Sequence, residues 1–314
     1  MPVERSNYVS DVWKNGLFEN RVVFCTGGSG SICSAQVRAL VHLGADACIV
    51  GRNTKKAEAV AKDIAMARPG SKVLGIGNVD VRVPESLERA IDQCVKELGS
   101  IDFLIAGAAG NFLAPMSRLS INAFRTVLEI DTLGSFNVTK LALPHLMAAA
   151  KKGVSSISTQ APAGRIIYVS ATMHYTGAQL QTHVAVAKSG VDALSANVAI
   201  EYGPHGITSN VISPGPIAGT EGMARLSVNP QFTGEGIPLG RAGTVKDIAD
   251  ATVYLFSHAG DYVNGVVLPV DGGAWRVAGG NPGGEFEYPG FLLSGKSVLV
   301  KAAGNESRKY GSKL

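Results

Sequence analysis

Residues 21–32 of this 314-residue chain read RVVFCTGGSGSI. The first half of this segment favours a β-strand because it consists mainly of β-branched and aromatic residues, and the glycines that follow favour a tight turn. A helical pattern then runs to a stop at Gly44. Strand, glycine turn and helix open a dinucleotide-binding domain, where N–H groups at the helix start bind a pyrophosphate. We therefore expect nucleotide contacts at Gly28, Ser29, Gly30, Ser31 and Ile32.

Outward from this unit, strand and helix patterns alternate along the chain. Strands are predicted at residues 47–50, 72–75, 101–105, 165–170, 207–213 and 267–270, and helices at 85–98, 119–147 and 184–199. This alternation predicts an α/β fold of the Rossmann type, with a doubly wound parallel sheet in a single domain.

The same pattern suggests three parts of the chain. We expect an N-terminal extension at residues 1–20, a nucleotide-binding domain at 21–275 and a C-terminal tail at 276–314. Residues 155–164 are predicted to be a surface insertion. Residues 218–240 form a long glycine-rich segment, and a loop of that length inside a compact domain predicts a substrate lid.

Composition and charge limit the class of function. The chain is 46% hydrophobic, and its formal net charge of +4 comes from 29 basic and 25 acidic residues. The last twenty residues supply this whole excess, so the rest of the chain is close to neutral. A nucleic-acid-binding domain would carry a basic face, and we expect no nucleic-acid partner. No segment approaches the roughly 18 apolar residues of a membrane span, so we expect no membrane insertion and no secretory signal.

Cysteine and histidine spacing argues against a metal site. Cys25, Cys33, Cys48 and Cys94 are scattered along the chain, without CxxC spacing. We expect buried free thiols in a reducing compartment rather than disulfides. The histidines have no cysteine or carboxylate beside them at ligand spacing, which also predicts no metal.

The end of the second predicted strand indicates which dinucleotide is bound. Residues 51–53 read GRN and lack the acidic residue that an NAD-preferring site places on the ribose 2′-hydroxyl. Arg52, helped by Lys55 or Lys56, would instead pair with a 2′-phosphate, which favours NADP(H). The alternative, a basic first turn of a solvated helix, is less attractive because cations are disfavoured at a helix N-terminus.

Several motifs together resemble the short-chain dehydrogenase/reductase family between about residues 20 and 275. They are TGGSGSI, GRN, Asp80-Val81, AGAAG (106–110), Lys188, PGPI (214–217) and VDGG (270–273). The resemblance implies a homodimer or homotetramer. It also implies cofactor contacts at Asp80, Val81, Lys188, Pro214, Gly215, Ile217 and Thr220.

This chain departs from the family pattern at two places. Ser31 and Cys33 replace usual glycines, so their side chains must point away from the pyrophosphate. The family also places a tyrosine four residues before the lysine, and a serine about seventeen residues before it. Here those positions hold Val184 and Ala171, so the usual acid for carbonyl reduction is missing.

A narrower resemblance is consistent with that loss. AAGNF (108–112), IDTLGSFNV (130–138), QTHVAVAK (181–188) and PGPIAGTEG (214–222) resemble the peroxisomal 2,4-dienoyl-CoA reductases, particularly those of fungi. The resemblance implies NADPH-dependent reduction of 2,4-dienoyl-CoA to trans-3-enoyl-CoA in beta-oxidation of unsaturated fatty acids. Hydride goes to C5 and the resulting dienolate is protonated at C2. Such chemistry needs hydrogen bonds at the thioester oxygen and an acid at carbon.

This reaction suggests a role for each candidate residue. Asn111 would donate to the thioester oxygen, and Phe112 would lie beside the diene. Asp131 and Lys188 would hold a water that protonates C2, while Lys188 also reaches the nicotinamide ribose. Arg225 is a candidate for a CoA phosphate. The alternatives are a turn role for Asn111 and a solvated position in mid-helix for Asp131.

Two further functional hypotheses stay open. One is another peroxisomal NADPH-dependent carbonyl or enoyl-CoA reductase, with Tyr175 or His183 as the acid; His174 is a further candidate acid. The other is a non-catalytic NADPH-binding sensor.

The chain stops at Ser312-Lys313-Leu314, a peroxisomal address that an import receptor binds. This ending predicts the import receptor as a partner and the peroxisomal matrix as the location.

Overall fold

The structure is a computed structural model that describes residues 3–152, 164–226, 234 and 236–277. Its seven-stranded parallel sheet has the order β3-β2-β1-β4-β5-β6-β7. The strands are β1 (Val22–Thr26), β2 (Asp46–Val50), β3 (Val73–Ile76), β4 (Phe103–Ala106), β5 (Gly164–Val169), β6 (Ile207–Pro214) and β7 (Val267–Val270). The architecture confirms the predicted α/β fold of the Rossmann type.

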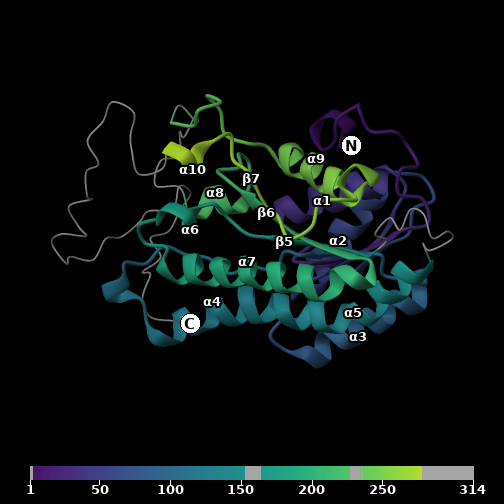
Figure 1. Cartoon of the computed structure of the whole chain (residues 1–314), viewed down its shortest axis with the longest axis horizontal. Coiled ribbons are helices and arrows are strands. Elements are labelled where there is room, and N and C mark those ends of the chain that lie inside the picture. Colours follow the sequence, from purple (N-terminus) through teal and green to yellow (C-terminus); the bar gives the residue numbers. More distant parts are fainter. Residues whose placement is uncertain (1–2, 153–163, 227–233, 235, 278–314) are drawn as a thin grey trace.

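Helices cover both faces of the sheet. They are α1 (Ser31–His42), α2 (Thr54–Ala65), α3 (Pro84–Leu98), α4 (Ile121–Leu128), α5 (Gly134–Lys152), α6 (Met173–Thr176), α7 (Thr182–Tyr202), α8 (Glu221–Leu226), α9 (Val245–Phe256) and α10 (Ala274–Val277). Figure 1 shows α1 and α9 on one side of the sheet and α3, α5 and α7 on the other. A hydrophobic core lies on each face of the sheet, and alternate residues of β1 pack into one or the other. Val23 and Cys25 face α1 and α9, and Phe24 faces α3 and α5. Both faces are buried, as a parallel sheet requires.

The residues before β1 dock on this domain. Val9 and Phe18 are buried in the core that α1 and α9 share. The carboxylate of Asp250 in α9 accepts hydrogen bonds from the Ser10 N–H and from Trp13 Nε1, both at 2.9 Å. Residues 3–20 therefore complete one face of the nucleotide-binding fold.

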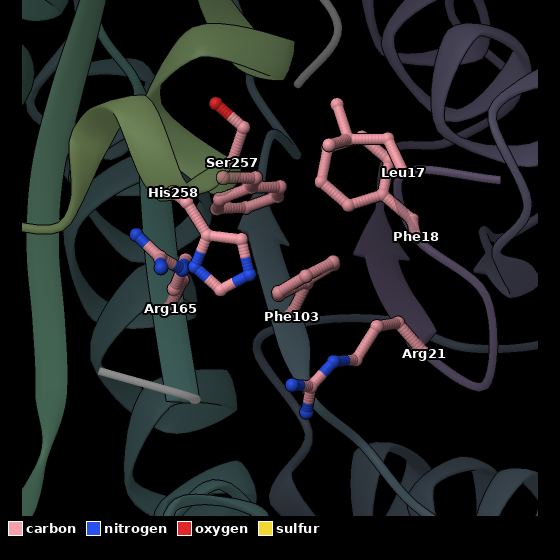
Figure 2. A pocket seen from close by; sticks show the side chains of 8 residues that line it. Leu17, Phe18, Arg21, Phe103, Arg165, Ser257 and His258 are labelled. Carbon is pink, nitrogen blue, oxygen red and sulfur yellow. The ribbon is translucent and has the colours of Figure 1, made fainter. Parts of the chain in front are cut away.

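The amino-terminal edge of the sheet carries a small cavity of about 20 Å³ (Figure 2). Phe103 lies at its centre, edge-on to Phe18 and stacked on Phe256 at 4.7 Å. Arg21 and Arg165 at its rim pair with Asp102 and Asp261. Such a volume suits about one water molecule, so this cavity has no room for a substrate.

The predicted elements differ from the observed ones mainly at their ends. The predicted helix at 119–147 is α4 and α5, joined by a π-helical turn at Glu129–Leu133. The hydrophobic pattern of the sequence does not reveal this π-helical turn, because the turn differs from an α-helical one by a single added residue. Helices α2 and α9 and the short helices α6, α8 and α10 are not among the predicted elements, and α7 begins at Thr182, two residues before the predicted start.

Some predictions concern residues outside the described ranges. They are the insertion at 155–164 apart from Gly164, residues 227–233 and 235 of the lid, and the tail from 278 onward with Ser312, Lys313 and Leu314. The described part of the lid holds α8 and the turn around residues 236–240.

Two other findings concern composition. The cysteines are all free and buried, as predicted. Within the described ranges, none of the helices combines the length and apolar character needed to cross a bilayer.

Candidate active site

The glycine turn after β1 sits tightly between neighbouring strands. Gly27 has φ +66°, and a Cβ there would lie 2.7 Å from the Gly107 carbonyl oxygen. A Cβ at Gly28 would lie 2.6 Å from the Ile49 Cβ. Helix α1 then begins with Gly30 as its N-cap and no side chain capping its first N–H groups. These N–H groups are therefore available to an anion such as a pyrophosphate.

The two non-glycine residues of this turn face different ways. The Cys33 thiol is buried and lies 3.8 Å from the Gly107 carbonyl oxygen, so it points into the fold as the sequence analysis required. Ser31 Oγ instead accepts a hydrogen bond of 3.4 Å from the Glu221 N–H at the start of α8. Ser31 thus links the turn to the lid segment.

Of the three basic residues predicted for a 2′-phosphate, Arg52 and Lys56 differ in what they contact. Arg52 is exposed, and within the described ranges it makes no ion pair. Lys56 Nζ lies 2.6 Å from Glu221 Oε1, and this lysine is the main cause of the lowered pKa of Glu221. A phosphate can therefore pair with Arg52 directly, but it must displace the Glu221 carboxylate to pair with Lys56.

Asp80 and Val81 lie at the end of the loop after β3. The Asp80 carboxylate is held by the Arg82 guanidinium, whose hydrogen bonds lower the pKa of Asp80. The Val81 carbonyl oxygen accepts from Asn137 Nδ2 at 2.9 Å. These contacts fix the loop that carries both predicted cofactor residues.

The segment after β6 approaches the end of β7. A Cβ at Gly215 would lie 2.5 Å from the Asp271 Cβ, so the backbone there passes very close. The Ile217 side chain is buried in the core, which leaves only its main chain for a cofactor. Thr220 Oγ1 accepts from the Met223 N–H at 3.2 Å and so stabilises the first turn of α8. Pro214 ends β6 at the same edge.

Lys188 and Asp131 form the centre of the site. Lys188 Nζ lies 3.0 Å from Asp131 Oδ2, and their side chains are 6% and 0% exposed. The contact is an ion pair by distance, although Oδ2 accepts no well-aligned hydrogen bond. Lys188 Nζ also donates to the Val169 carbonyl oxygen at 2.9 Å. Asp131 is therefore not a solvated residue in mid-helix: the π-helical turn carries it inward.

The same carboxylate fixes the loop after β4. Asp131 Oδ1 accepts a 2.7 Å hydrogen bond from the Gly110 N–H. Asn111 follows directly, and its buried Oδ1 has no partner in the described part of the chain. The amide is thus held beside the ion pair with an unsatisfied polar atom, which is costly unless a ligand or water joins it.

Next to this loop, Phe112 and His183 form a stacked pair. Their ring centroids are 4.2 Å apart with an interplanar angle of 21°. Burial is the main cause of the lowered pKa of His183, and neither ring nitrogen makes a well-aligned hydrogen bond within the described ranges. Val184 packs with Val127 and Ala187, so an apolar contact replaces the usual tyrosine.

The other candidate acids belong to a separate cluster. His174 Nε2 lies 2.7 Å from Asp192 Oδ2, and the Tyr175 hydroxyl donates to the same oxygen at 3.2 Å. Burial raises the pKa of Tyr175 to about 12. Neither side chain is hydrogen-bonded to Lys188, Asp131 or Asn111.

Arg225 lies on α8, its side chain 69% exposed, and pairs with Glu221 at 3.6 Å. Glu221 is the participant that sequence reasoning missed, since a lone glutamate in a loop carries no signal of its partner. Within the described ranges no group of three His, Cys, Asp or Glu residues could hold a metal.

The chain is similar to known reductases and dehydrogenases. A family model described as enoyl-(acyl carrier protein) reductase matches residues 27–274. A Saccharomyces cerevisiae protein named peroxisomal 2,4-dienoyl-CoA reductase SPS19, (3E)-enoyl-CoA-producing, is 46% identical over 92% of this chain and 94% of its own length. A Danio rerio peroxisomal 2,4-dienoyl-CoA reductase is 39% identical over 88% of both chains. The solved structure of a Bacillus anthracis short chain dehydrogenase has a TM-score of 0.69 and 32% identity, covering 81% of this chain and 96% of that one.

Proposed function

This chain belongs to the short-chain dehydrogenase/reductase family, and from that premise we propose that it is an NADPH-dependent 2,4-dienoyl-CoA reductase that forms trans-3-enoyl-CoA. Its yeast and zebrafish relatives carry the name of that activity and match nearly the full chain. The observation that carries the proposal is the buried Lys188–Asp131 pair beside Val184. It is a polar centre without the phenol that a carbonyl reductase needs.

The first part of the mechanism is binding and orientation of the cofactor. The dinucleotide supplies a hydride when bound. The N–H groups at the start of α1 and the exposed Arg52 suit its phosphates. Lys188 Nζ gives one N–H to the Val169 carbonyl oxygen and faces Asp131 Oδ2 with another, so its third N–H can reach the ribose hydroxyls. The 2′-phosphate preference follows from Arg52 together with Lys56.

The second part is stabilisation of the reacting thioester. Asn111 is held by its neighbour Gly110, whose N–H is tied to Asp131. Its amide N–H₂ donates to the thioester oxygen, and this hydrogen bond strengthens as negative charge develops there. Phe112, held against His183, presents a flat apolar wall to the diene.

The third part is protonation at C2. Asp131 and Lys188 are too deeply buried to be surface charges, and together they orient a water that gives a proton to C2. The Lys188 ammonium returns a proton to the hydroxide left behind and is itself protonated again from solvent. Asp131 Oδ2, which accepts no well-aligned hydrogen bond within the described ranges, is the acceptor that positions this water. No acid is needed at the thioester oxygen, so Val184 is compatible with turnover.

We also propose where the protein works and how it assembles. Its relatives have peroxisomal in their names, which agrees with import through Ser312-Lys313-Leu314 into the peroxisomal matrix. Leu133 at the end of the π-helical turn, Phe136 on α5 and Val186 on α7 are exposed apolar residues. They supply a surface for a homodimer or homotetramer.

The test is NADPH oxidation by the purified protein with three thioesters: a 2,4-dienoyl-CoA, a 2-enoyl-CoA and a 3-ketoacyl-CoA. We expect turnover of the dienoyl thioester alone, with trans-3-enoyl-CoA as product. The enoyl substrate is the important control, because the matching family model is described as an enoyl reductase. Turnover of the ketone would contradict the proposal and would make Tyr175 or His183 the acid.

A further inference from the structure

Gln181, the residue before the first turn of α7, is a buried polar side chain that the proposed mechanism does not use. It is 6% exposed, and its Oε1 atom has no hydrogen-bond partner in the described part of the chain. Within the same ranges its Nε2 atom donates no hydrogen bond either. A buried amide left unpaired is costly, so this side chain calls for a ligand or a water.

Local structure does not account for this glutamine. It occupies the N-cap position of α7, but its side chain makes no capping hydrogen bond, and glutamine is not among the residues preferred there. Leu180, directly before it, has φ +65°, which is uncommon for a residue with a bulky side chain. Backbone strain of this kind gathers at active sites and ligand-binding segments. The start of α7 therefore has the features of a segment that binds a ligand.

The backbone places Gln181 against the loop that carries Asn111. The Leu180 carbonyl oxygen accepts a 3.1 Å hydrogen bond from the Ala114 N–H. The stacked aromatic pair beside them joins the same two segments. Asn111 Oδ1 is also buried and has no partner in the described part of the chain. Two segments that are held together thus each carry a buried amide with an unsatisfied oxygen.

The spacing along α7 places Gln181 on the face of the helix that carries Lys188. The two residues are seven positions apart, which is nearly two complete turns at about 3.6 residues per turn. Val184, at the position of the family's missing tyrosine, lies between them on the same side. Helical side chains lean toward the N-terminus of their helix, so a tyrosine at position 184 would extend toward Gln181. The shorter valine leaves that space beside the glutamine.

An amide suits the reaction at this place. In the proposed reaction the electrons move to the thioester oxygen, whereas the proton goes to carbon. An amide N–H₂ group donates a hydrogen bond but keeps its proton, so it stabilises a negative oxygen without protonating it. A carbonyl oxygen has two lone pairs and can accept two such bonds, of which Asn111 supplies one.

We propose that the Gln181 amide is the second hydrogen-bond donor to the thioester oxygen, together with Asn111, in place of the tyrosine hydroxyl of carbonyl-reducing relatives. The inference rests on the proposed function, since it takes the dienoyl thioester as the substrate. Gln181 is then a catalytic residue, because its hydrogen bond strengthens as negative charge develops on that oxygen.

The kinetic test uses two variants. Gln181→Leu removes the donor and keeps a side chain of similar size, and Gln181→Glu keeps the shape but replaces the donor with an acceptor. Both should lower kcat for a 2,4-dienoyl-CoA about 100-fold, the usual effect of removing one donor from an oxyanion. KM for the thioester and Kd for NADPH should stay within about threefold, because the bond gains its strength in the transition state. A kcat close to that of the parent chain in both variants would overturn the proposal.

Gln36 provides a matched control. It is another fully buried glutamine with an unpaired Oε1, but it lies between α1 and α9, where its Nε2 donates to Thr252 Oγ1 at 2.8 Å. Gln36→Leu should leave kcat unchanged. An equal loss of kcat in Gln36→Leu and Gln181→Leu would show a general effect of removing a buried amide and would overturn the proposal.

An infrared measurement separates a bond to the substrate from a structural role. A dienoyl-CoA with an isotopic label at the thioester carbonyl is bound in the presence of NADP⁺, which has no hydride to give, and its C=O stretching frequency is recorded. Each hydrogen bond lowers this frequency, so Gln181→Leu and Asn111→Ala should each raise it, and the double variant should raise it further.

The outcomes distinguish this proposal from the proposed function. Turnover of dienoyl-CoA by the parent chain, with a carbonyl frequency that Gln181→Leu leaves unchanged, would overturn the role of Gln181 alone. A parent chain without dienoyl turnover, in which Gln181→Leu still raises the frequency of the bound thioester, would reject the proposed function and leave Gln181 as a donor to the thioester oxygen.

Discussion

Lys188 Nζ lies 3.0 Å from Asp131 Oδ2 in a pair that is almost completely removed from solvent. The other oxygen of the same carboxylate accepts from the Gly110 N–H. One side chain on a π-helical turn thus connects the lysine of α7 with the loop that carries Asn111. Such a turn often marks a functional position in a helix, and here it points a carboxylate inward.

The first prediction concerns that carboxylate. Asp131→Asn keeps an oxygen for the Gly110 N–H but removes the charge beside Lys188, so it separates positioning of the loop from protonation. We expect kcat for the dienoyl thioester to fall about 100-fold or more, the usual range for a lost acid–base group. Asp131→Ala should nearly abolish turnover. Affinity for NADPH, measured by titration, should stay within about threefold of the parent chain.

Unchanged turnover in Asp131→Asn would remove Asp131 from the chemistry. Lys188→Ala is the matched variant, and it should also weaken cofactor binding. We therefore expect NADPH affinity to fall in Lys188→Ala and to stay nearly unchanged in the Asp131 variants.

The second prediction concerns His183, the neighbour of the missing tyrosine. Its lowered pKa and complete burial indicate a neutral ring that supports Phe112 by stacking. His183→Phe should therefore keep the stacked pair and leave kcat within about fivefold of the parent chain, because aromatic pairs contribute about 1 kcal/mol. The pH dependence of kcat should show the same ionisations in His183→Phe as in the parent chain. A hundredfold loss together with a changed pH profile would make His183 the acid.

The sequence predicted more of the fold than of the site. The glycine turn and the strand pattern are local features that the sequence pattern places, and the family resemblance of QTHVAVAK (181–188) places Lys188. The inward turn at Asp131 depends on one extra residue in a helix, and the Lys56–Glu221 pair joins residues far apart in the chain. Neither leaves a periodic signal. The role of Glu221 therefore depends on how α2 and α8 are placed in the fold.

The third prediction concerns Glu221, whose carboxylate pairs with Lys56. Glu221 lies 2.6 Å from Lys56 Nζ, where it would repel a 2′-phosphate. Glu221→Gln should raise kcat/KM for NADPH by up to about fivefold, since exposed ion pairs contribute at most about 1 kcal/mol. The value for NADH should not change. Lys56→Met is the complementary variant and should lower kcat/KM for NADPH only. Equal changes with both cofactors would place the 2′-phosphate elsewhere.

The last prediction concerns stability at the start of α9. Asp247 accepts from both terminal nitrogens of Arg241, which is the main cause of its lowered pKa, and from the Thr244 N–H at 2.7 Å. Together these contacts lower the pKa of Asp247 from 3.8 to about 2. A carboxyl group whose pKa is lower in the folded than in the unfolded chain stabilises the fold at pH values above its unfolded pKa. This contribution is lost as the pH falls from about 4 to about 2.

Asp247→Asn removes the charged half of the capping box, which typically costs about 1 kcal/mol, or roughly 2 to 4 °C in Tm for a chain of this size. The difference in Tm between parent and variant should be full at pH 6 and should shrink steadily below pH 4. A difference that is constant down to pH 2 would show that ionised Asp247 has no part in stability. Asp92→Asn, on the exposed side of α3, is the control and should leave the curve unchanged.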